Sequence, residues 1–348
     1  MILETPNMNK NILLVFTGGT IGSQVTGSIV DTSAAAGFKL LALFADHYPE
    51  AGSIAFKSQQ PLRILSENLH TQHWSQIIAA IEAEDLNQFD GIIVTHGTDT
   101  LAFSAAALGL YFHKLPIPLL LVSSDLPLDS PQANGLANFC CAVEFIRRGG
   151  QPGVYVPYRN PGQDQQVHLA TRLSSCLPLS SDFISIQSQP FMRFSDGRFE
   201  TLAQPDSSSR QSANLKPDFS ARILLVRPYP GLDYTAFNPE GFDVVLHDLY
   251  HSGTACASNS AGDRFSLVAF IRKCREKGRK VYLAPALRSE SAYASTSDLI
   301  AAGAEMVWNM SLEAAYAKLL LALGNFTESE QVSEFLRLDL AYEHVQPA

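Results

Sequence analysis

Short runs of apolar residues alternate with longer amphipathic segments along most of the chain. The runs that predict strands are Ile12–Phe16, Ile54–Lys57, Leu62–Leu65, Gly91–Thr95, Ile117–Ser123 and Gly153–Val156, and the segments that predict helices are Ala34–His47, Thr71–Glu84, Leu101–Phe112 and Asn134–Arg148. Because the runs are continuous and rich in Val, Ile and Leu, we expect strands that helices cover on both faces. The strand-helix order predicts an α/β fold whose larger N-terminal domain is a doubly wound, mostly parallel sheet. Ser33 and Thr71 are the expected helix N-caps.

The composition changes over residues 203–219, which are rich in Ser, include two prolines and form the best linker candidate. The alternation then resumes, with strands expected at Ile223–Val226, Val244–His247 and Val281–Ala284 and helices at about Gly262–Lys277, Ser295–Ala302 and Leu312–Leu323. We therefore expect an N-terminal catalytic domain over residues 1–205, a linker over 206–219 and a smaller C-terminal α/β domain over 220–348.

Charge and composition exclude several classes of protein. The net charge is −9 and no long basic run occurs, so nucleic acid and anionic membranes are poor partners. The longest apolar runs fall far short of the roughly 20 residues that a membrane span needs. The run after Lys10 is also too short for an export signal, so we expect a cytoplasmic protein. The five cysteines are an odd number without CxxC spacing, which indicates buried free thiols in a reducing compartment and no metal site.

The first predicted strand runs directly into the sequence TGGTIGS, residues 17–23. Paired glycines let the backbone turn sharply and approach a ligand closely, and Gly19 is therefore a candidate substrate contact. Thr20 follows at the tip of the turn, where nearby N–H groups can hold an oxyanion. A Gly-Gly turn alone fits a phosphate loop equally well, but neither GxGxxG spacing nor GK[ST] is present.

A second strand, Gly91–Thr95, runs into the sequence THGTDT, residues 95–100. Ligands of open parallel sheets bind at the carboxyl ends of the strands, so Thr98 and Asp99 are expected to face a cleft. The alternative for Asp99 is a helix N-cap, which contributes about 1 kcal/mol to stability.

Together the two segments closely resemble the two signature segments of the bacterial L-asparaginase family. The similarity extends over nearly the whole chain, including DGIIVTHGTDTLAFSAAAL at residues 90–108 and GAEMVWNMSLEAAYAKLLLAL at residues 303–323. The start of the chain favours the cytoplasmic type I branch over the transfer-RNA amidotransferase subunit that shares these motifs. The resemblance implies a homodimer or homotetramer, a small amino-acid substrate and no cofactor or metal.

The resemblance also implies roles for individual residues. Thr20 matches the threonine that becomes acylated, and Thr98 matches the second catalytic threonine. Asp99 matches the carboxylate that holds the substrate's α-ammonium group. Ser66 and Glu67 match the pair that contacts the substrate's α-carboxylate and α-amine. A hydroxyl and a strand-end carboxylate can anchor a zwitterion, which leaves its side-chain amide at Thr20.

Three positions depart from the family pattern. The expected Thr-Lys step is Thr171-Arg172 here, and arginine cannot act as a base because its pKa stays above about 12. A surface arginine at a misaligned position remains an alternative for Arg172. The lid after the first strand has Ser28 near the usual tyrosine, and the segment around His251 lacks the usual asparagine, the nearest being Asn259.

Asparagine hydrolysis through a threonine nucleophile is the favoured function. An amidase for glutamine or a modified amino acid is a second hypothesis, and the departures at Ser28 and Arg172 favour a third, a weakly catalytic amino-acid sensor. Retention of Thr20, Thr98 and Asp99 together argues against the sensor. The sequence leaves open which amide is cleaved and which group supplies the base.

Overall fold

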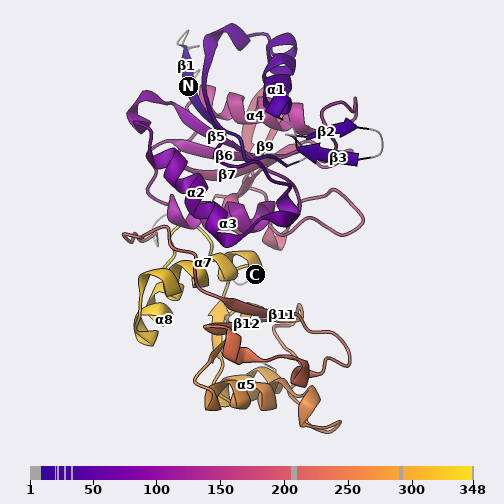
Figure 1. Cartoon of the computed structure of the whole chain (residues 1–348), viewed down its shortest axis with the longest axis vertical. Helices are drawn as coiled ribbons and strands as arrows, with labels where there is room; N and C mark the ends of the chain where they lie inside the picture. Colours follow the sequence, from indigo (N-terminus) through magenta and orange to yellow (C-terminus); the bar gives the residue numbers. More distant parts are fainter. Residues whose placement is uncertain are drawn as a thin grey trace. The chain divides into compact units, whose positions relative to one another are not determined.

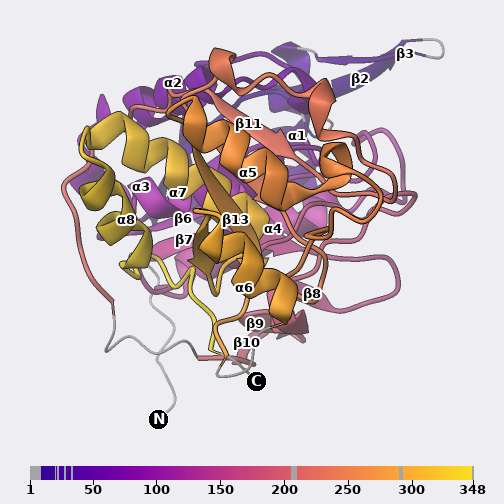
Figure 2. The ribbon, with the colours of Figure 1, turned by 90° about the horizontal axis from the view of Figure 1, so that it is seen from below.

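The computed structural model describes residues 9–19, 21, 23–26, 29–32, 34–204, 210–289 and 293–346. The chain divides into two compact units, Met1–Pro205 and Asp206–Ala348, and each is described by itself. Figures 1 and 2 give two views of the ribbon.

An eight-stranded sheet forms the centre of the first unit. Its strands, in spatial order, are β10 (Arg198–Thr201), β9 (Met192–Ser195), β8 (Gln165–Leu169), β7 (Gly153–Tyr158), β6 (Pro118–Val122), β5 (Gly91–Thr95), β1 (Lys10–Val15) and β4 (Ile54–Gln59). The five strands from β7 to β4 run parallel, whereas β8, β9 and β10 pair antiparallel. Every residue of β5 and β6 is buried, as expected of central parallel strands. The predicted α/β class with a mostly parallel sheet is confirmed.

Helices cover both faces of this sheet. They are α1 (Ala34–His47), α2 (Thr71–Glu82), α3 (Leu101–Tyr111) and α4 (Gly135–Arg147). In Figure 1, α1 and α4 lie on one side of the strands and α2 and α3 on the other. A two-stranded antiparallel hairpin, β2 (Ser23–Thr26) and β3 (Ile29–Thr32), extends away from the sheet in both views. This layering leaves the carboxyl ends of β1 and β5 side by side.

The strand expected at Leu62–Leu65 does not form. Only Ile64 pairs, in a single bridge to Gly18, and a 3-10 turn, Ser66–Asn68, begins directly afterwards. Pro61 also fixes the backbone just before this segment. The apolar run therefore forms one isolated bridge and not a strand.

The cap predicted at Thr71 is wrong by one residue. His70 is the N-cap of α2, and its Nδ1 accepts a hydrogen bond from the backbone N–H of Gln72 at 3.4 Å. The backbone N–H of His70 in turn donates to Nδ1 of His73 at 2.9 Å. Two imidazoles thus do here what Ser or Thr and Glu usually do at helix starts. The other expected cap, Ser33, lies outside the described residues.

The second unit is built on a four-stranded parallel sheet, in the order β11 (Ile223–Val226), β12 (Val244–Asp248), β13 (Lys280–Ala286) and β14 (Glu305–Trp308). Its helices are α5 (Leu267–Glu276), α6 (Ala294–Ala301), α7 (Leu312–Asn325) and α8 (Ser329–Arg337). Figure 1 shows α5 and α7 on opposite sides of the strands. We did not predict β14 or α8. The expected helix at Gly262–Lys277 is shorter, because Ser266 caps α5 through a bond from the N–H of Ala269.

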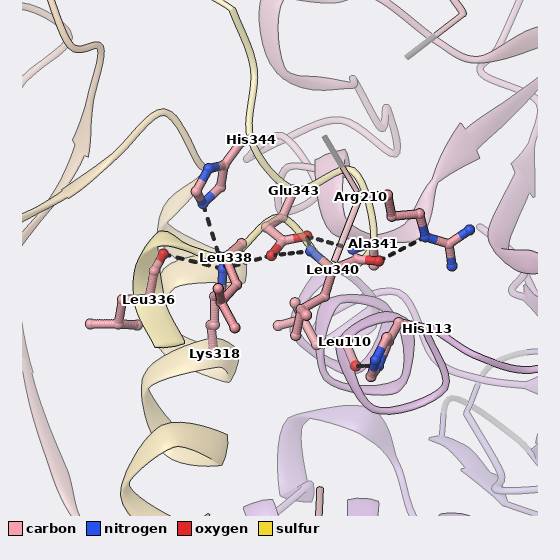
Figure 3. A network of polar contacts seen from close by, with 10 residues as sticks. All are labelled: Leu110, His113, Arg210, Lys318, Leu336, Leu338, Leu340, Ala341, Glu343 and His344. Atoms are coloured by element: carbon pink, nitrogen blue, oxygen red, sulfur yellow. Dashed lines mark hydrogen bonds and ion pairs between the residues drawn. The ribbon is translucent and has the colours of Figure 1, made fainter. Parts of the chain in front are cut away.

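A lysine without solvent exposure organises the end of the chain (Figure 3). Lys318 Nζ lies 2.6 Å from Glu343 Oε1, and both side chains are completely buried. The same ammonium donates to the carbonyl oxygens of Leu336 and Leu338, and Glu343 accepts from the backbone N–H groups of Leu340 and Ala341, which completes the network. The pair is hydrogen-bonded on both sides, as a buried ion pair requires.

Candidate functional site

Two glycines at the end of β1 bring the first motif against the second. Gly18 and Gly19 have positive φ angles of 105° and 75°, a region that suits glycine. The N–H of Gly19 donates to the carbonyl of Ile64 at 2.9 Å. A Cβ atom on Gly19 would lie 2.3 Å from the backbone nitrogen of Gly97, so the two turns touch backbone to backbone. The predicted close approach at Gly19 is thus a contact with the THGTDT segment itself.

Gly97 is in turn pressed against the loop after β4. A Cβ atom at Gly97 would lie 2.4 Å from Ser66 Oγ, closer than any real contact. Three segments that are far apart in sequence therefore meet at Gly19, Gly97 and Ser66, at the carboxyl edge of the sheet. This is where ligands bind in open α/β sheets.

Ser66 and Asp99 are joined by two hydrogen bonds. The hydroxyl of Ser66 donates to Asp99 Oδ2 at 3.0 Å and accepts from the N–H of Asp99 at 3.3 Å. The hydroxyl of Thr100 donates to the carbonyl of Ser66 at 2.9 Å. Ser66 is buried, whereas Asp99 is exposed. The carboxylate of Asp99 is therefore fixed by a buried hydroxyl while it remains accessible to solvent.

Asp99 does not cap α3. The helix begins at Leu101, its N-cap position is occupied by Thr100, and no side chain caps it. The capping alternative for Asp99 is therefore wrong. Its carboxylate is held by Ser66 instead, which keeps it accessible for a cation.

A pair of buried threonines, which the sequence did not single out, supports the two motifs. The hydroxyl of Thr17 donates to the carbonyl of Thr95 at 2.6 Å, and the N–H of Thr17 donates to Thr95 Oγ1 at 3.4 Å. Both residues are buried. They tie the ends of β1 and β5 together one step below the glycines. Only the shared Thr-x-Gly-Thr pattern of the two motifs hinted at this pair.

His96 is buried beside the site in its neutral form. Burial lowers the pKa of His96, and the Gly97 carbonyl and Asp99 only partly oppose this. Its Nδ1 lies 2.8 Å from the carbonyl oxygen of Gly97, which can only accept, so Nδ1 carries the proton. Nε2 has no partner among the described residues.

The segment of Arg172 lies against α3. The turn Ala170–Arg172 packs on this helix, and a Cβ atom at Gly109 would lie 3.1 Å from Thr171 Cγ2. Gly109 is well along α3 from its start at Leu101. Arg172 is half-buried.

Four residues after Arg172 the chain comes within electrostatic range of Asp99. Burial raises the pKa of the Cys176 thiol, and the negative charges of Asp99 and Asp182 raise it further. Cys176 was assigned no role from the sequence. The loop after this turn is therefore close enough for the charge of Asp99 to act on it.

Side-chain amides fix the neighbouring strand ends. Asn138 donates to the carbonyl of Ser123 at 2.9 Å, and its Oδ1 accepts from the N–H of Arg159 at 2.9 Å and from Gln165 Nε2 at 3.1 Å. All of these bonds lie at the carboxyl ends of β6 and β7 or just beyond. They hold the loops beside the candidate site in one arrangement.

The structure thus brings Gly19, Ser66 and Asp99 together. Thr98 is half-buried next to Asp99, and Glu67 is exposed next to Ser66. Thr20 and Ser28 lie outside the described residues.

No group of three or more His, Cys, Asp or Glu side chains gathers in the part of the chain that the structure describes. Among the described helices, none combines the length and apolarity that a membrane span needs.

Comparison with known proteins gives a family and a fold. The profile of the family described as Asparaginase, N-terminal, matches residues 11–206. The chain is 29% identical to a glutamyl-tRNA(Gln) amidotransferase subunit of Aeropyrum pernix over 98% of this chain and 82% of that protein. It is 26% identical to the L-asparaginase of Thermococcus kodakarensis over 95% of this chain and 98% of that protein.

Solved structures agree on the fold. The thermostable L-asparaginase of Thermococcus kodakarensis superposes with a TM-score of 0.78 at 24% identity, over 97% of this chain and all of that one. The L-asparaginase I of Vibrio cholerae superposes with a TM-score of 0.73 at 22% identity, over 97% of this chain and 99% of that one.

Proposed function

The chain belongs to the asparaginase family and is an amidohydrolase, and we propose that it hydrolyses the side-chain amide of L-asparagine with Thr20 as the nucleophile. The observation that carries this proposal is the Ser66–Asp99 pair, which lies beside the contact between the Gly19 and Gly97 turns.

The pair suits the head of an α-amino acid. The exposed carboxylate of Asp99 can accept hydrogen bonds from an α-ammonium group, a charge-assisted contact that contributes about 1.5–3 kcal/mol. Ser66 fixes the orientation of that carboxylate. The exposed carboxylate of Glu67, the next residue in the sequence, is proposed to bind the same ammonium group. A substrate anchored in this way would direct its side chain toward the glycine turn.

The proposed chemistry is acyl transfer to a hydroxyl. Thr20 Oγ1 attacks the amide carbon, the C–N bond breaks, and the departing nitrogen takes up a proton and leaves as ammonia. Water then attacks the ester, releases aspartate and restores the threonine hydroxyl. Backbone N–H groups of the glycine turn would stabilise the oxyanion in both steps, other than the N–H of Gly19, which is bonded to the carbonyl of Ile64.

Arg172 is proposed to act through its charge rather than as a base. A guanidinium in the place of the family lysine would stabilise negative charge that develops beside Thr98. It cannot take a proton from Thr98, so the base is another group.

Glutamine is the second candidate substrate. The glutamyl-tRNA(Gln) amidotransferase relatives match 98% of this chain in Aeropyrum pernix and in Methanosarcina acetivorans, at 29% and 27% identity. Their name points to glutamine-linked amide chemistry. A weakly catalytic amino-acid sensor is the third candidate, which the arginine at position 172 favours.

The type I branch, a cytoplasmic location and a homodimer or homotetramer complete the proposal. They rest on the family resemblance.

Ammonia release from L-asparagine, L-glutamine and D-asparagine separates these functions. We expect L-asparagine to give the highest kcat/KM. The Asp99→Asn variant should raise KM for the preferred substrate by about 10-fold or more, since one charge-assisted contact is lost. A preference for glutamine would favour the second candidate. Tight binding of an amino acid without ammonia release would favour the sensor.

A further inference from the structure

The C-terminal unit contains a cavity of about 530 Å³ that the proposed reaction does not use. It is lined by the segment Ala304–Asn309, which includes β14, together with Ile300 of α6 and Ser333, Leu336 and Arg337 of α8. Arg288, just after β13, and His344 near the end of the chain complete the lining. Such a volume accommodates a ligand.

The cavity follows the edge of the sheet. Successive side chains of a strand point to opposite faces, so a cavity on one face touches every second residue. This cavity touches all six residues from 304 to 309. A groove beside the strand reaches residues of both faces, and β14 is the outer strand of its sheet.

Backbone groups along this edge are available for hydrogen bonding. Within the described part of the chain, the N–H groups of Glu305–Trp308 make no backbone bond outside the sheet. Since alternate N–H and C=O groups of an edge strand point outward, part of this capacity faces the groove. At its far end the edge is already used: the N–H of Val345 donates to the carbonyl of Asn309 at 2.7 Å.

The charge that faces the groove is positive, although the whole chain carries −9. Arg288 and Arg337 are exposed, and neither guanidinium makes a hydrogen bond or ion pair with any residue that the structure describes. The lone acid in the lining, Glu305, is already paired with Lys280 at 3.0 Å and accepts from Ser333 at 2.9 Å.

We propose that the β14 edge docks an extended acidic segment of a partner protein, which adds to the sheet as a fifth strand. Four residues at about 3.3 Å each match the length of Glu305–Trp308. Backbone bonds to the edge hold the segment, and its acidic side chains pair with Arg288 and Arg337. The proposal is independent of the amide chemistry assigned to the other unit.

The test uses the full-length protein and a synthetic peptide of alternating Glu and Val with blocked ends. Trp308 lines the groove, and the other tryptophan, Trp74, is fully buried in the N-terminal unit, so fluorescence reports on the groove. We expect saturable binding that weakens at least 10-fold in both Arg337→Gln and Arg288→Gln. The matched control is Arg272→Gln, an exposed arginine of α5 outside the groove, which should bind like the wild type.

Backbone pairing is tested with the same peptide methylated on every second backbone nitrogen, in both registers. One register must lose binding at least 10-fold, because its methyl groups meet the edge. Equal binding of both registers would overturn strand addition, and so would complete displacement of the peptide by millimolar aspartate or inorganic phosphate, which would indicate a small-anion site. Absence of peptide binding, or self-association through this edge in place of it, would overturn the proposal.

Discussion

The hydroxyl of Ser66 donates to the carboxylate of Asp99 at 3.0 Å, and the backbone N–H of Asp99 donates back to the same hydroxyl at 3.3 Å. One buried side chain thus fixes an exposed carboxylate at the end of β5. Because Ser66 itself packs against Gly97, the position of Asp99 depends on the packing of two loops and not on a capping bond to α3.

Ser66→Ala should therefore impair substrate binding more than stability. The variant loses the hydroxyl that orients Asp99, but the carboxylate is exposed and water can replace the bond. A hydrogen bond to a charged group contributes about 1.5–3 kcal/mol, and we expect substrate binding to weaken by this amount. The free energy of unfolding should change by less. Steady-state kinetics and urea unfolding of the variant measure both. A KM like that of the wild type would show that Ser66 does not control the carboxylate.

Gly97→Ala should disrupt the site most severely. The new methyl group would lie 2.4 Å from Ser66 Oγ, and in Gly19→Ala it would meet the Gly97 backbone at 2.3 Å. Overpacking of this kind costs about 1–3 kcal/mol and shifts the backbone. Gly52→Ala is the control, because nothing lies within 4 Å of its added methyl group. If thermal unfolding and activity of Gly97→Ala equal those of the Gly52 control, the three segments are less tightly packed than described.

Arg172→Lys should introduce a group that can titrate. A lysine can lose its proton, so we expect equal or faster turnover on asparagine and a new pKa on the basic limb of the pH–rate profile. Arg172→Met should lose activity, since it has no charge. Initial rates between pH 6 and 10 measure both effects. If both variants match the wild type, Arg172 lies outside the site and its correspondence to the family lysine is wrong.

Lys318→Met should destabilise the C-terminal unit strongly. Removing one partner of a buried ion pair leaves Glu343 charged and without its partner, which costs about 3–5 kcal/mol. Urea unfolding measures this loss. A cost below about 1 kcal/mol would mean that water reaches the pair.

Asp339 should make stability fall as the pH rises toward neutral. Burial and the charge of Glu343 raise the pKa of Asp339 from 3.8 to about 7. The contribution of Asp339 to the free energy of unfolding is therefore complete below pH 3.8 and is lost as the pH rises through 7. Asp339→Asn should unfold at a higher temperature than the wild type at pH 8 and at a similar temperature at pH 4. The exposed Asp298→Asn serves as the control, and an identical pH dependence in both variants would contradict the assignment.

The sequence predicted the sheet of the first unit well because its central strands are buried on both faces and leave continuous apolar runs. Gly91–Thr95 was predicted with its observed bounds. β14 was missed because it has only four residues and begins with Glu305, so burial on one side leaves little pattern.

Site contacts followed less directly from the sequence. The motifs pointed to Gly19 and Asp99, but the partner of Asp99 depends on a loop more than 30 residues earlier. Local rules offered a helix cap as the alternative for Asp99, but its side chain is hydrogen-bonded to Ser66 instead. The Thr17–Thr95 pair and Cys176 were missed because their partners are set by tertiary packing.

Ammonia release by Thr20→Ala decides whether Thr20 is the nucleophile. We expect the wild type to release ammonia from L-asparagine and Thr20→Ala to lose at least about 10³-fold in kcat, a fall of about 4 kcal/mol in transition-state stabilisation. The circular dichroism and melting temperature of the variant should match those of the wild type. The exposed Thr201→Ala of β10 controls for the substitution and should keep full activity. Ammonia release by Thr20→Ala at the wild-type rate would show that Thr20 is not the nucleophile.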